Sequence, residues 1–282
     1  MILKMGLLLN NKLSYLFYFL FVFGVMFSQE GNELNNVKDY KDPEQFTKFR
    51  KRRLVIVSWQ INQLKKGALV VRLKTNKKLI EALKKQGKQE LAIQKEAEQL
   101  AITKNTILAY TSKLTFCKVY FIYSDFADSL LHGARKGIFL DSSLTINPSI
   151  EMSEQFYLIA ERDYAYNSSI GFVKQDSAKY VFEAGNPVKE MAVVVKNKYG
   201  HQLKGPFPYY VKDKTYAGVN ASVNQYVVLN GKTHLVTIGK QFSKEKLFLY
   251  LGVLDDNLRQ FYQSTSTPEI EKINPEILPF LY

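Results

Sequence analysis

Two short apolar runs flank a long polar stretch in the first half of the chain. The first run covers residues 67–73 and the second covers residues 118–124, and the stretch between them is rich in Lys, Gln and Glu. Apolar runs of this length are typical of buried parallel strands, which need a crossover connection, usually a helix, to join them. The pattern therefore predicts an α/β fold whose mixed sheet is built on a central β-α-β unit with a long helix.

A further helix is expected just before the first strand. Asp42 suits a helix N-cap and Pro43 suits the first helical position. Apolar residues then recur three and four positions apart, which predicts a helix to about Lys66. The members of this apolar stripe are Leu54, Val57, Ile61 and Leu64. Because residues 54–57 are rich in β-branched side chains, a strand there is the alternative.

The polar stretch between the two strands predicts a helix from Thr75 or Asn76 to about Leu114. Gly87 is expected to bend or break this helix, because glycine inside a helix costs about 1 kcal/mol relative to alanine. The apolar positions form an imperfect stripe of Ile80, Leu83, Leu91, Ala97, Leu100, Ala101, Ile107 and Leu108.

The second half of the chain predicts the remaining strands, a C-terminal β-hairpin and a final helix. Asn230-Gly231 stands between two apolar runs, and this dipeptide suits the type I′ turn of a hairpin. Pro206 and Pro208 place the strand that they interrupt at an edge of the sheet. The expected strands are residues 138–140, 156–160, 171–173, 180–183, 191–195, 207–211, 226–229 and 233–237, and the expected helix is residues 244–262.

An apolar segment near the N-terminus predicts export. Residues 13–27 are almost wholly apolar, follow Lys4 and Lys12, and precede the small residue Ser28. The segment is shorter than the about 20 residues of a membrane span and matches the apolar part of a secretory signal peptide. We expect a signal peptide at 1–28, a linker at 29–41, a single α/β domain at 42–264 and a tail at 265–282. The mature chain would have no transmembrane span and would lie in the periplasm, on the outer surface or in the medium, and an uncleaved anchor is the alternative.

Five stretches of the sequence are similar to segments of other proteins. They are residues 59–61 (Trp-Gln-Ile), 67–75 (Gly-Ala-Leu-Val-Val-Arg-Leu-Lys-Thr), 117–125 (Cys-Lys-Val-Tyr-Phe-Ile-Tyr-Ser-Asp), 138–141 (Ile-Phe-Leu-Asp) and 206–211 (Pro-Phe-Pro-Tyr-Tyr-Val). They resemble an uncharacterised family of secreted proteins from Bacteroidetes. The resemblance implies export and a place in the cell envelope, and it implies no cofactor or catalytic residue because the family has no established activity.

The cysteine and histidine residues argue against several kinds of site. Cys117 is the only cysteine, so no internal disulfide can form, and its apolar neighbours favour a core position over a nucleophile. His132, His201 and His234 are scattered without the spacing of metal ligands. We therefore expect no metal site and no cofactor.

The positive charge is concentrated in one part of the chain. The formal net charge is +13, and 17 Lys and Arg residues face four acidic residues between Lys48 and Lys113. Such a surface favours binding to an anionic envelope polymer, and a solvated helix face is the alternative. The candidates are Lys77, Lys84, Lys88 and Lys95. Nucleic acid is not favoured as a partner, because no Trp or Tyr is interleaved with the lysines over residues 74–109.

A second candidate site follows from sheet geometry, because ligands of open α/β sheets bind beyond the carboxyl ends of the strands. Three predicted strands end in polar residues, and the candidates are Arg72, Tyr123, Asp125, Glu161, Arg162 and Asp163. If Arg72 is partly buried, we expect Asp125 or Glu161 to pair with it. Breaking such a pair by Arg72→Ala would cost about 3–5 kcal/mol.

These patterns leave two hypotheses for function. The first is a non-catalytic envelope protein that binds a partner or an anionic surface polymer. The alternative is a hydrolase that acts on envelope material through carboxylates at the strand ends. Closely spaced carboxylates in a pocket would favour the hydrolase, and a rim whose charges are all paired would favour the binding protein.

Overall fold

The computed structural model describes residues 43–175, 178–212 and 221–265. The predicted signal peptide, the predicted linker and all but the first residue of the predicted tail lie outside this range. The described residues fall into two compact units, of which one holds 43–49, 169–175 and 178–184 and the other holds 50–168, 185–212 and 221–265. Among the described residues, no helix is both long and apolar enough to cross a bilayer.

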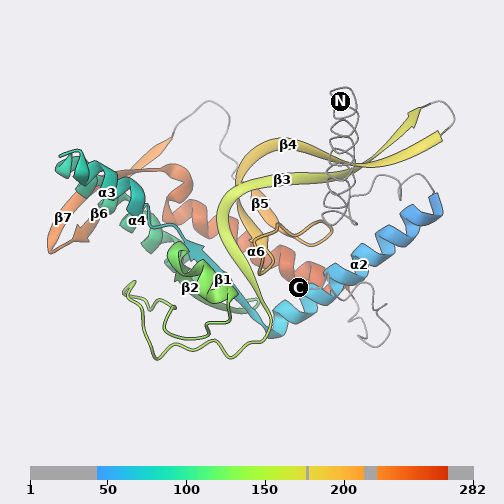
Figure 1. Ribbon diagram of the computed structural model, residues 1–282, viewed down its shortest axis with the longest axis horizontal. Coiled ribbons are helices and arrows are strands. Elements are labelled where there is room, and N and C mark those ends of the chain that lie inside the picture. Colours follow the sequence, from blue (N-terminus) through green and yellow to red (C-terminus); the bar gives the residue numbers. More distant parts are fainter. Residues whose placement is uncertain (1–42, 176–177, 213–220, 266–282) are drawn as a thin grey trace, which may run out of the picture. The chain divides into compact units, whose positions relative to one another are not determined.

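A five-stranded mixed sheet has the strand order β2-β1-β3-β4-β5 (Figure 1). β1 is parallel to both β2 and β3, whereas β4 is antiparallel to β5. The strands of this sheet are β1 (Ala68–Leu73), β2 (Lys118–Tyr123), β3 (Tyr157–Gln175), β4 (Ala178–Lys196) and β5 (Tyr210–Lys212). The predicted α/β class and the β-α-β unit are thus confirmed, as is the edge position of the strand that follows Pro208.

The helices follow the predicted pattern closely. They are α2 (Pro43–Lys66), α3 (Lys77–Lys85), α4 (Gln89–Lys113), α5 (Ala127–Leu131) and α6 (Lys244–Ser264), with short 3-10 turns η3 (Ser124–Phe126) and η4 (Lys240–Phe242). Gly87 separates α3 from α4 with a φ of +73°, which L-residues rarely adopt. The strand alternative for residues 54–57 is wrong, because they are helical.

Three residues of the predicted apolar stripes are exposed to solvent. Leu54, Leu91 and Leu108 are exposed, although Ile61, Leu64 and Ala101 on the same stripes are fully buried. An apolar stripe wider than the surface that covers it leaves its outer members in solvent, and single exposed leucines are normal on protein surfaces.

Three predicted strands differ from the structure. Residues 138–140 form isolated bridges, Ile122 with Phe139 and Leu140 with Ile146, rather than a strand, although all three of their side chains are buried. The short strands expected at 171–173 and 180–183 are parts of β3 and β4, which have 19 residues each. Backbone pairing carries these strands through polar positions, where a search for apolar runs ends them.

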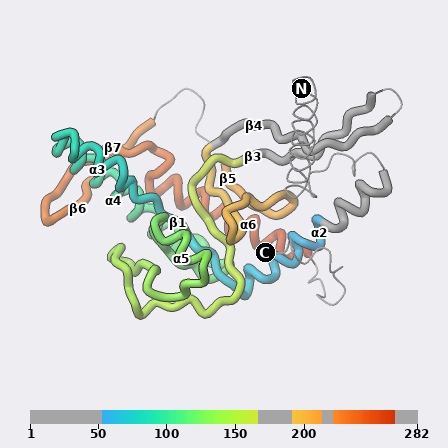
Figure 2. The backbone as a smooth tube through the Cα atoms, in the orientation of Figure 1, coloured from blue at the N-terminus to red at the C-terminus, as the bar shows by residue number. Residues whose placement is uncertain are grey.

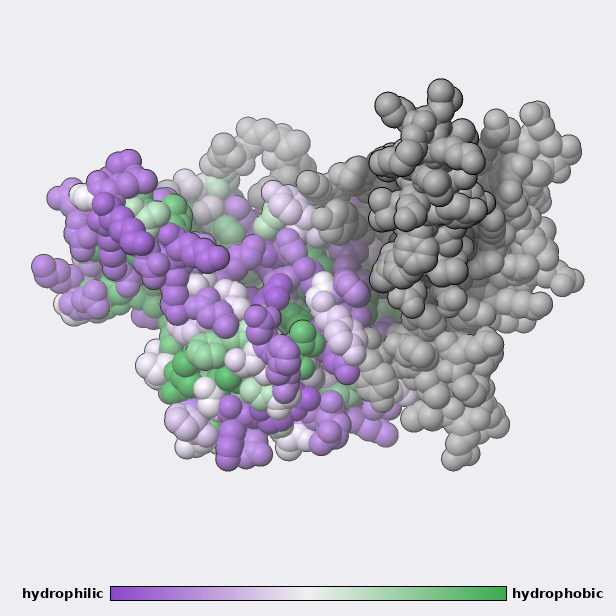
Figure 3. Space-filling view, in the orientation of Figure 1, coloured by the Kyte–Doolittle hydropathy of each residue, from purple (hydrophilic) through white to green (hydrophobic). Residues whose placement is uncertain are grey.

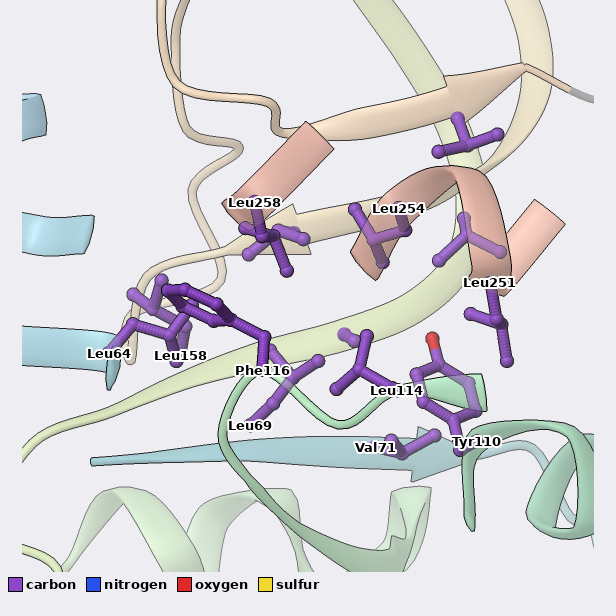
Figure 4. Packing of buried hydrophobic residues seen from close by; sticks show 14 of the residues in the cluster. Leu64, Leu69, Val71, Tyr110, Leu114, Phe116, Leu158, Leu251, Leu254 and Leu258 are labelled. Carbon is purple, nitrogen blue, oxygen red and sulfur yellow. The ribbon is translucent and has the colours of Figure 1, made fainter. Parts of the chain in front are cut away.

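The two faces of the sheet are buried by different elements. On the first face, Leu69, Val71 and Leu73 of β1 pack in a large cluster with residues from α2, α4 and α6 (Figure 4). On the second face, Ala68 and Val70 pack with α5 and the loop that follows it. Strand side chains alternate between faces, so these assignments fix which face each later residue of β1 and β3 occupies.

A separate two-stranded sheet covers α4. β6 (Ser222–Leu229) and β7 (Lys232–Gly239) form the predicted hairpin, and both residues of its Asn230-Gly231 turn have positive φ. Figure 2 shows the hairpin beside α4, where Val227 and Val236 pack with the small side chains Ala97 and Ala101.

Candidate functional site at the carboxyl end of β1

The strand register brings most of the predicted rim residues to one end of the sheet. Leu73 pairs with Tyr123, and Val71 pairs with Ala160, so Glu161 lies beside Arg72. Asp125 follows β2 at this same end, as expected. The structure divides the candidates into three groups, which are a buried ionic cluster on the second face, an exposed pair at the sheet edge, and Arg162 on the first face.

The ionic cluster consists of Arg72, Glu161, Asp163 and Lys196. Arg72 Nε donates to Glu161 Oε2 at 2.6 Å, and Lys196 Nζ donates to Glu161 Oε1 and to Asp163 Oδ2, the latter at 2.6 Å. The side chains of Glu161 and Lys196 are only 4% and 12% exposed, whereas that of Arg72 is 27% exposed. Glu161 is therefore the partner of Arg72, and Asp125 is not.

Hydrogen bonds keep Lys196 and Asp163 of this cluster ionised. Burial lowers the pKa of Lys196, but its bonds to Asp163 and Glu161 outweigh burial and raise the pKa above its usual value. Burial raises the pKa of Asp163, but bonds from Lys196 and the Tyr164 amide outweigh it and hold the pKa below its usual value. Each carboxylate already accepts from a cation, so neither is free to act as a general base.

Lys196 is the member of the cluster that the sequence did not identify. It ends β4 directly after buried Val194 and Val195. Its position two residues beyond Val194 places it on the second face, next to Glu161. In the sequence, Lys196 directly follows three valines, which could have marked it as a polar residue at a strand end. Pairing it with Glu161 also requires knowing that β4 lies beside β3.

The second group, Tyr123 and Asp125 at the edge of the sheet, is separate from the ionic cluster. Asp125 accepts from Lys77 Nζ at 2.5 Å and from Thr75 Oγ1 at 3.2 Å. The hydrogen bond from Lys77 holds the pKa of Asp125 below its usual value. Tyr123 donates its hydroxyl to the Leu144 carbonyl at 2.9 Å. These bonds tie β2 to the start of α3 and to the following loop, and the exposed ion pair contributes little stability.

Arg162 lines a cavity on the first face, which we call the inner cavity. Its volume is about 210 Å³, and its walls include Ile102, Thr106, Tyr110, Arg162, Val193 and Leu247. The Arg162 guanidinium lies over the Phe242 ring, with Cζ 4.3 Å from the ring centroid. Burial lowers the pKa of Arg162 to about 10, so the side chain stays charged at neutral pH.

A second, larger hollow lies beside the inner cavity. It has a volume of about 430 Å³ and is lined by Lys74, Lys77, Lys84 and Tyr123, among others. Lys74, Gln99 and Thr103 line both spaces. Asn76 Nδ2 donates to Gln99 Oε1 at 2.6 Å, and Gln99 Nε2 donates to Thr103 Oγ1 at 3.3 Å, so a chain of polar side chains lies where the two spaces meet.

The lysines on and beside α3 form an exposed basic surface. Ile80 and Leu83 are buried against Ala92 of α4, so the other positions of this amphipathic helix face solvent. Hydrophilic residues gather over α3 in Figure 3. The α3 lysine surface consists of Lys74, Lys77, Lys78, Lys84, Lys85 and Lys88, all exposed.

Three of the four lysines expected to bind polyanions have carboxylate partners. Lys77 pairs with Asp125, Lys84 lies 3.7 Å from Glu96, and Lys95 lies 2.7 Å from Glu98. Lys88, the fourth, has no ion pair among the residues that the structure describes. The sequence thus indicates the basic region but does not show which of its lysines form ion pairs with carboxylates.

Neither the cysteine nor the acidic residues provide a further reactive site in the described ranges. Burial raises the pKa of the Cys117 thiol to about 12, which keeps it protonated and unreactive. Within residues 43–175, 178–212 and 221–265, no three His, Cys, Asp or Glu side chains gather as metal ligands would.

Comparison with known proteins does not assign the chain to a family. No protein-family model, no curated protein and no solved structure matches it. The resemblance to secreted proteins from Bacteroidetes stays a hypothesis.

Proposed function

We propose that this chain is an exported, non-catalytic protein of the cell envelope that binds an anionic polymer on the α3 lysine surface. The observation that carries the proposal is the exposure of six lysines between Lys74 and Lys88, a stretch that holds a single acidic residue, Glu81. A surface of one sign attracts polyanions at long range, and a flexible polymer can follow a short exposed helix.

The unpaired members of this surface supply most of its attraction. Lys74, Lys78, Lys85 and Lys88 have no ion-pair partner in the described part of the chain. Lys77 and Lys84 are partly neutralised by Asp125 and Glu96. An unpaired lysine can release bound counterions from a polyanion, which is the main source of affinity in such complexes.

The hydrolase alternative has less support. Its acid and base would come from Glu161 and Asp163, and both are held by Lys196. Carboxylates that are balanced by close cationic partners suit a structural role. The lysines that have no ion-pair partner in the described part of the chain lie elsewhere, on and beside α3. The ionic cluster therefore favours the binding protein over the enzyme.

Export of the chain predicts a mature N-terminus at or near Gln29. The apolar segment 13–27 is too short for a membrane span, and Ser28 is a suitable small residue before the cleavage site. Mass spectrometry of protein isolated from its native host measures this terminus directly. Detection of intact chains that begin at Met1, in membrane fractions, would instead support an uncleaved anchor.

Reversing the unpaired lysines is expected to weaken polyanion binding. We expect Lys78→Glu/Lys85→Glu/Lys88→Glu to lower affinity for heparin, used as a model anionic polymer, by about tenfold or more near 0.1 M salt. Affinity of the wild-type chain should fall steeply as salt rises, because screening and counterion release both act on exposed charges. Isothermal titration calorimetry at several salt concentrations measures both effects.

The matched control changes the net charge by the same amount at other exposed lysines. Lys66→Glu/Lys113→Glu/Lys136→Glu lies outside the α3 lysine surface. The control should retain most of the affinity, and circular dichroism should show both variants folded. Equal loss in the two variants would mean that net charge alone governs binding, and binding independent of salt would contradict the proposal.

A further inference from the structure

We propose that the inner cavity binds a small carboxylic acid with an apolar body, whose carboxylate pairs with Arg162. This second site goes beyond polymer binding at α3, because it is a cavity on the first face of the sheet, whereas the α3 lysine surface is exposed to solvent and shares with it only Lys74. Either proposal can fail without the other.

The walls of the inner cavity suit an apolar body of limited size. Ile102 comes from α4, Val193 from β4 and Leu247 from α6, so three elements enclose the space with aliphatic side chains. Pockets for drug-sized ligands measure roughly 300–1,000 Å³. At about 210 Å³, the inner cavity fits a compact group such as a single aromatic ring or a short branched chain.

Arg162 gives the cavity a charged end with a defined orientation. The planar guanidinium matches a carboxylate with two parallel hydrogen bonds, and its stacking on Phe242 restricts its rotation. Charge interactions are stronger beside apolar walls than in water, because the local dielectric constant is lower. A carboxylate entering this space would gain most at Arg162.

The other charges around the cavity also favour an anion. Arg72 and Lys74 border it with positive charge, and the negative charge of Glu161 is held by Arg72 and Lys196. The charged side chains that line the cavity are three cations, Arg72, Lys74 and Arg162, and one carboxylate, Glu161, so a cationic ligand would meet a net positive charge. One guanidinium can give two parallel hydrogen bonds to a carboxylate or to a phosphate, and the small volume of the cavity favours the smaller, planar carboxylate.

Phenylacetate and phenylacetamide are suitable probe ligands, because they have nearly the same size and only phenylacetate is charged. We expect the full chain to bind phenylacetate saturably in ligand-observed NMR titrations, and to bind the amide at least tenfold more weakly. Equal binding of the two probes, or no saturable binding of phenylacetate, would overturn the proposal.

Two substitutions test the residues separately. Arg162→Gln should abolish the preference for phenylacetate over phenylacetamide. Thr106→Leu keeps Arg162 but fills the cavity, and should weaken phenylacetate binding at least tenfold. Thr106 and Thr111 both donate to the carbonyl four residues earlier on α4, but Thr111 is exposed. Thr111→Leu is therefore the matched control, and it should bind as the wild type does.

The readouts remain interpretable if one variant is unstable. Should Arg162→Gln unfold, the comparison of Thr106→Leu with Thr111→Leu still decides whether the probe occupies the inner cavity. Unchanged binding in Thr106→Leu would overturn the proposal. Heparin affinity should be the same in both threonine variants, so this test and the test of the α3 lysine surface have separate outcomes.

Discussion

Glu161→Gln is expected to lower the free energy of unfolding by about 3 kcal/mol, because it breaks a buried ionic cluster at its centre. Among the residues that the structure describes, Glu161 alone joins Arg72 to Lys196, and its side chain is 4% exposed. Without its charge, Arg72 on β1 would lose its carboxylate partner, and Lys196 on β4 would keep only the carboxylate of Asp163. Urea unfolding monitored by circular dichroism measures the loss.

Arg72→Gln is the comparison that tests this assignment. We expect it to cost only about 1 kcal/mol, because Arg72 is partly exposed and Glu161 keeps its bond to buried Lys196. This value is smaller than the about 3–5 kcal/mol expected from the sequence for Arg72→Ala, because the structure gives the Glu161 carboxylate a second partner, Lys196. A larger loss for Arg72→Gln than for Glu161→Gln would show that the cluster is centred elsewhere.

Asp255→Ala is expected to cost about 3 kcal/mol through a different mechanism. Asp255 Oδ1 accepts from the backbone amides of Thr115 and Phe116, both at 2.7 Å, and Oδ2 accepts from Arg259 Nε at 2.7 Å. Leaving a buried amide without an acceptor costs about 1–3 kcal/mol. The substitution would also release the turn that positions β2, so chemical unfolding should show a marked loss of stability.

Asp255→Asn separates the amide bonds from the charge. It keeps one oxygen as an acceptor and should cost less, about 1 kcal/mol. Burial raises the pKa of Asp255, but bonds from Arg259 and the two amides outweigh it and hold the pKa below its usual value. The charge therefore stabilises the fold above the unfolded-state pKa of about 4, and this gain is lost as the pH falls through the folded-state pKa.

The gap in stability between wild type and Asp255→Asn should accordingly shrink as the pH is lowered from about 6 to below 4. Unfolding curves for both proteins at each pH measure this gap. A gap that stayed constant over this range would mean that the Asp255 charge does not contribute to folding.

Elements set by local sequence were predicted well. α2, β1 and the β6–β7 hairpin follow from apolar spacing and from the turn residues Asn230 and Gly231. Gly87 breaks the long helix where its φ is positive, as its sequence position indicated. These features depend on residues a few positions apart, which a single sequence displays directly.

Features set by distant residues were predicted only in part. Arg72 and Glu161 were both named because polar residues end their strands, and parallel pairing of β1 with β3 joined them. Lys196 and Asp255 were missed, because each bonds a neighbouring element that the local pattern does not place beside it: Lys196 of β4 bonds Glu161 of β3, and Asp255 of α6 bonds the residues just before β2. Finding them requires the strand order and the helix packing, which local patterns do not contain.

Lysine footprinting tests most directly whether anionic polymers bind on the α3 lysine surface. The full chain is treated with an acetylating reagent with and without heparin, and each modified lysine is quantified by mass spectrometry. We predict strong protection of Lys78, Lys85 and Lys88, and little change at Lys66, Lys113 and Lys136. Protection of the second group without the first, or of neither at low salt, would contradict the account.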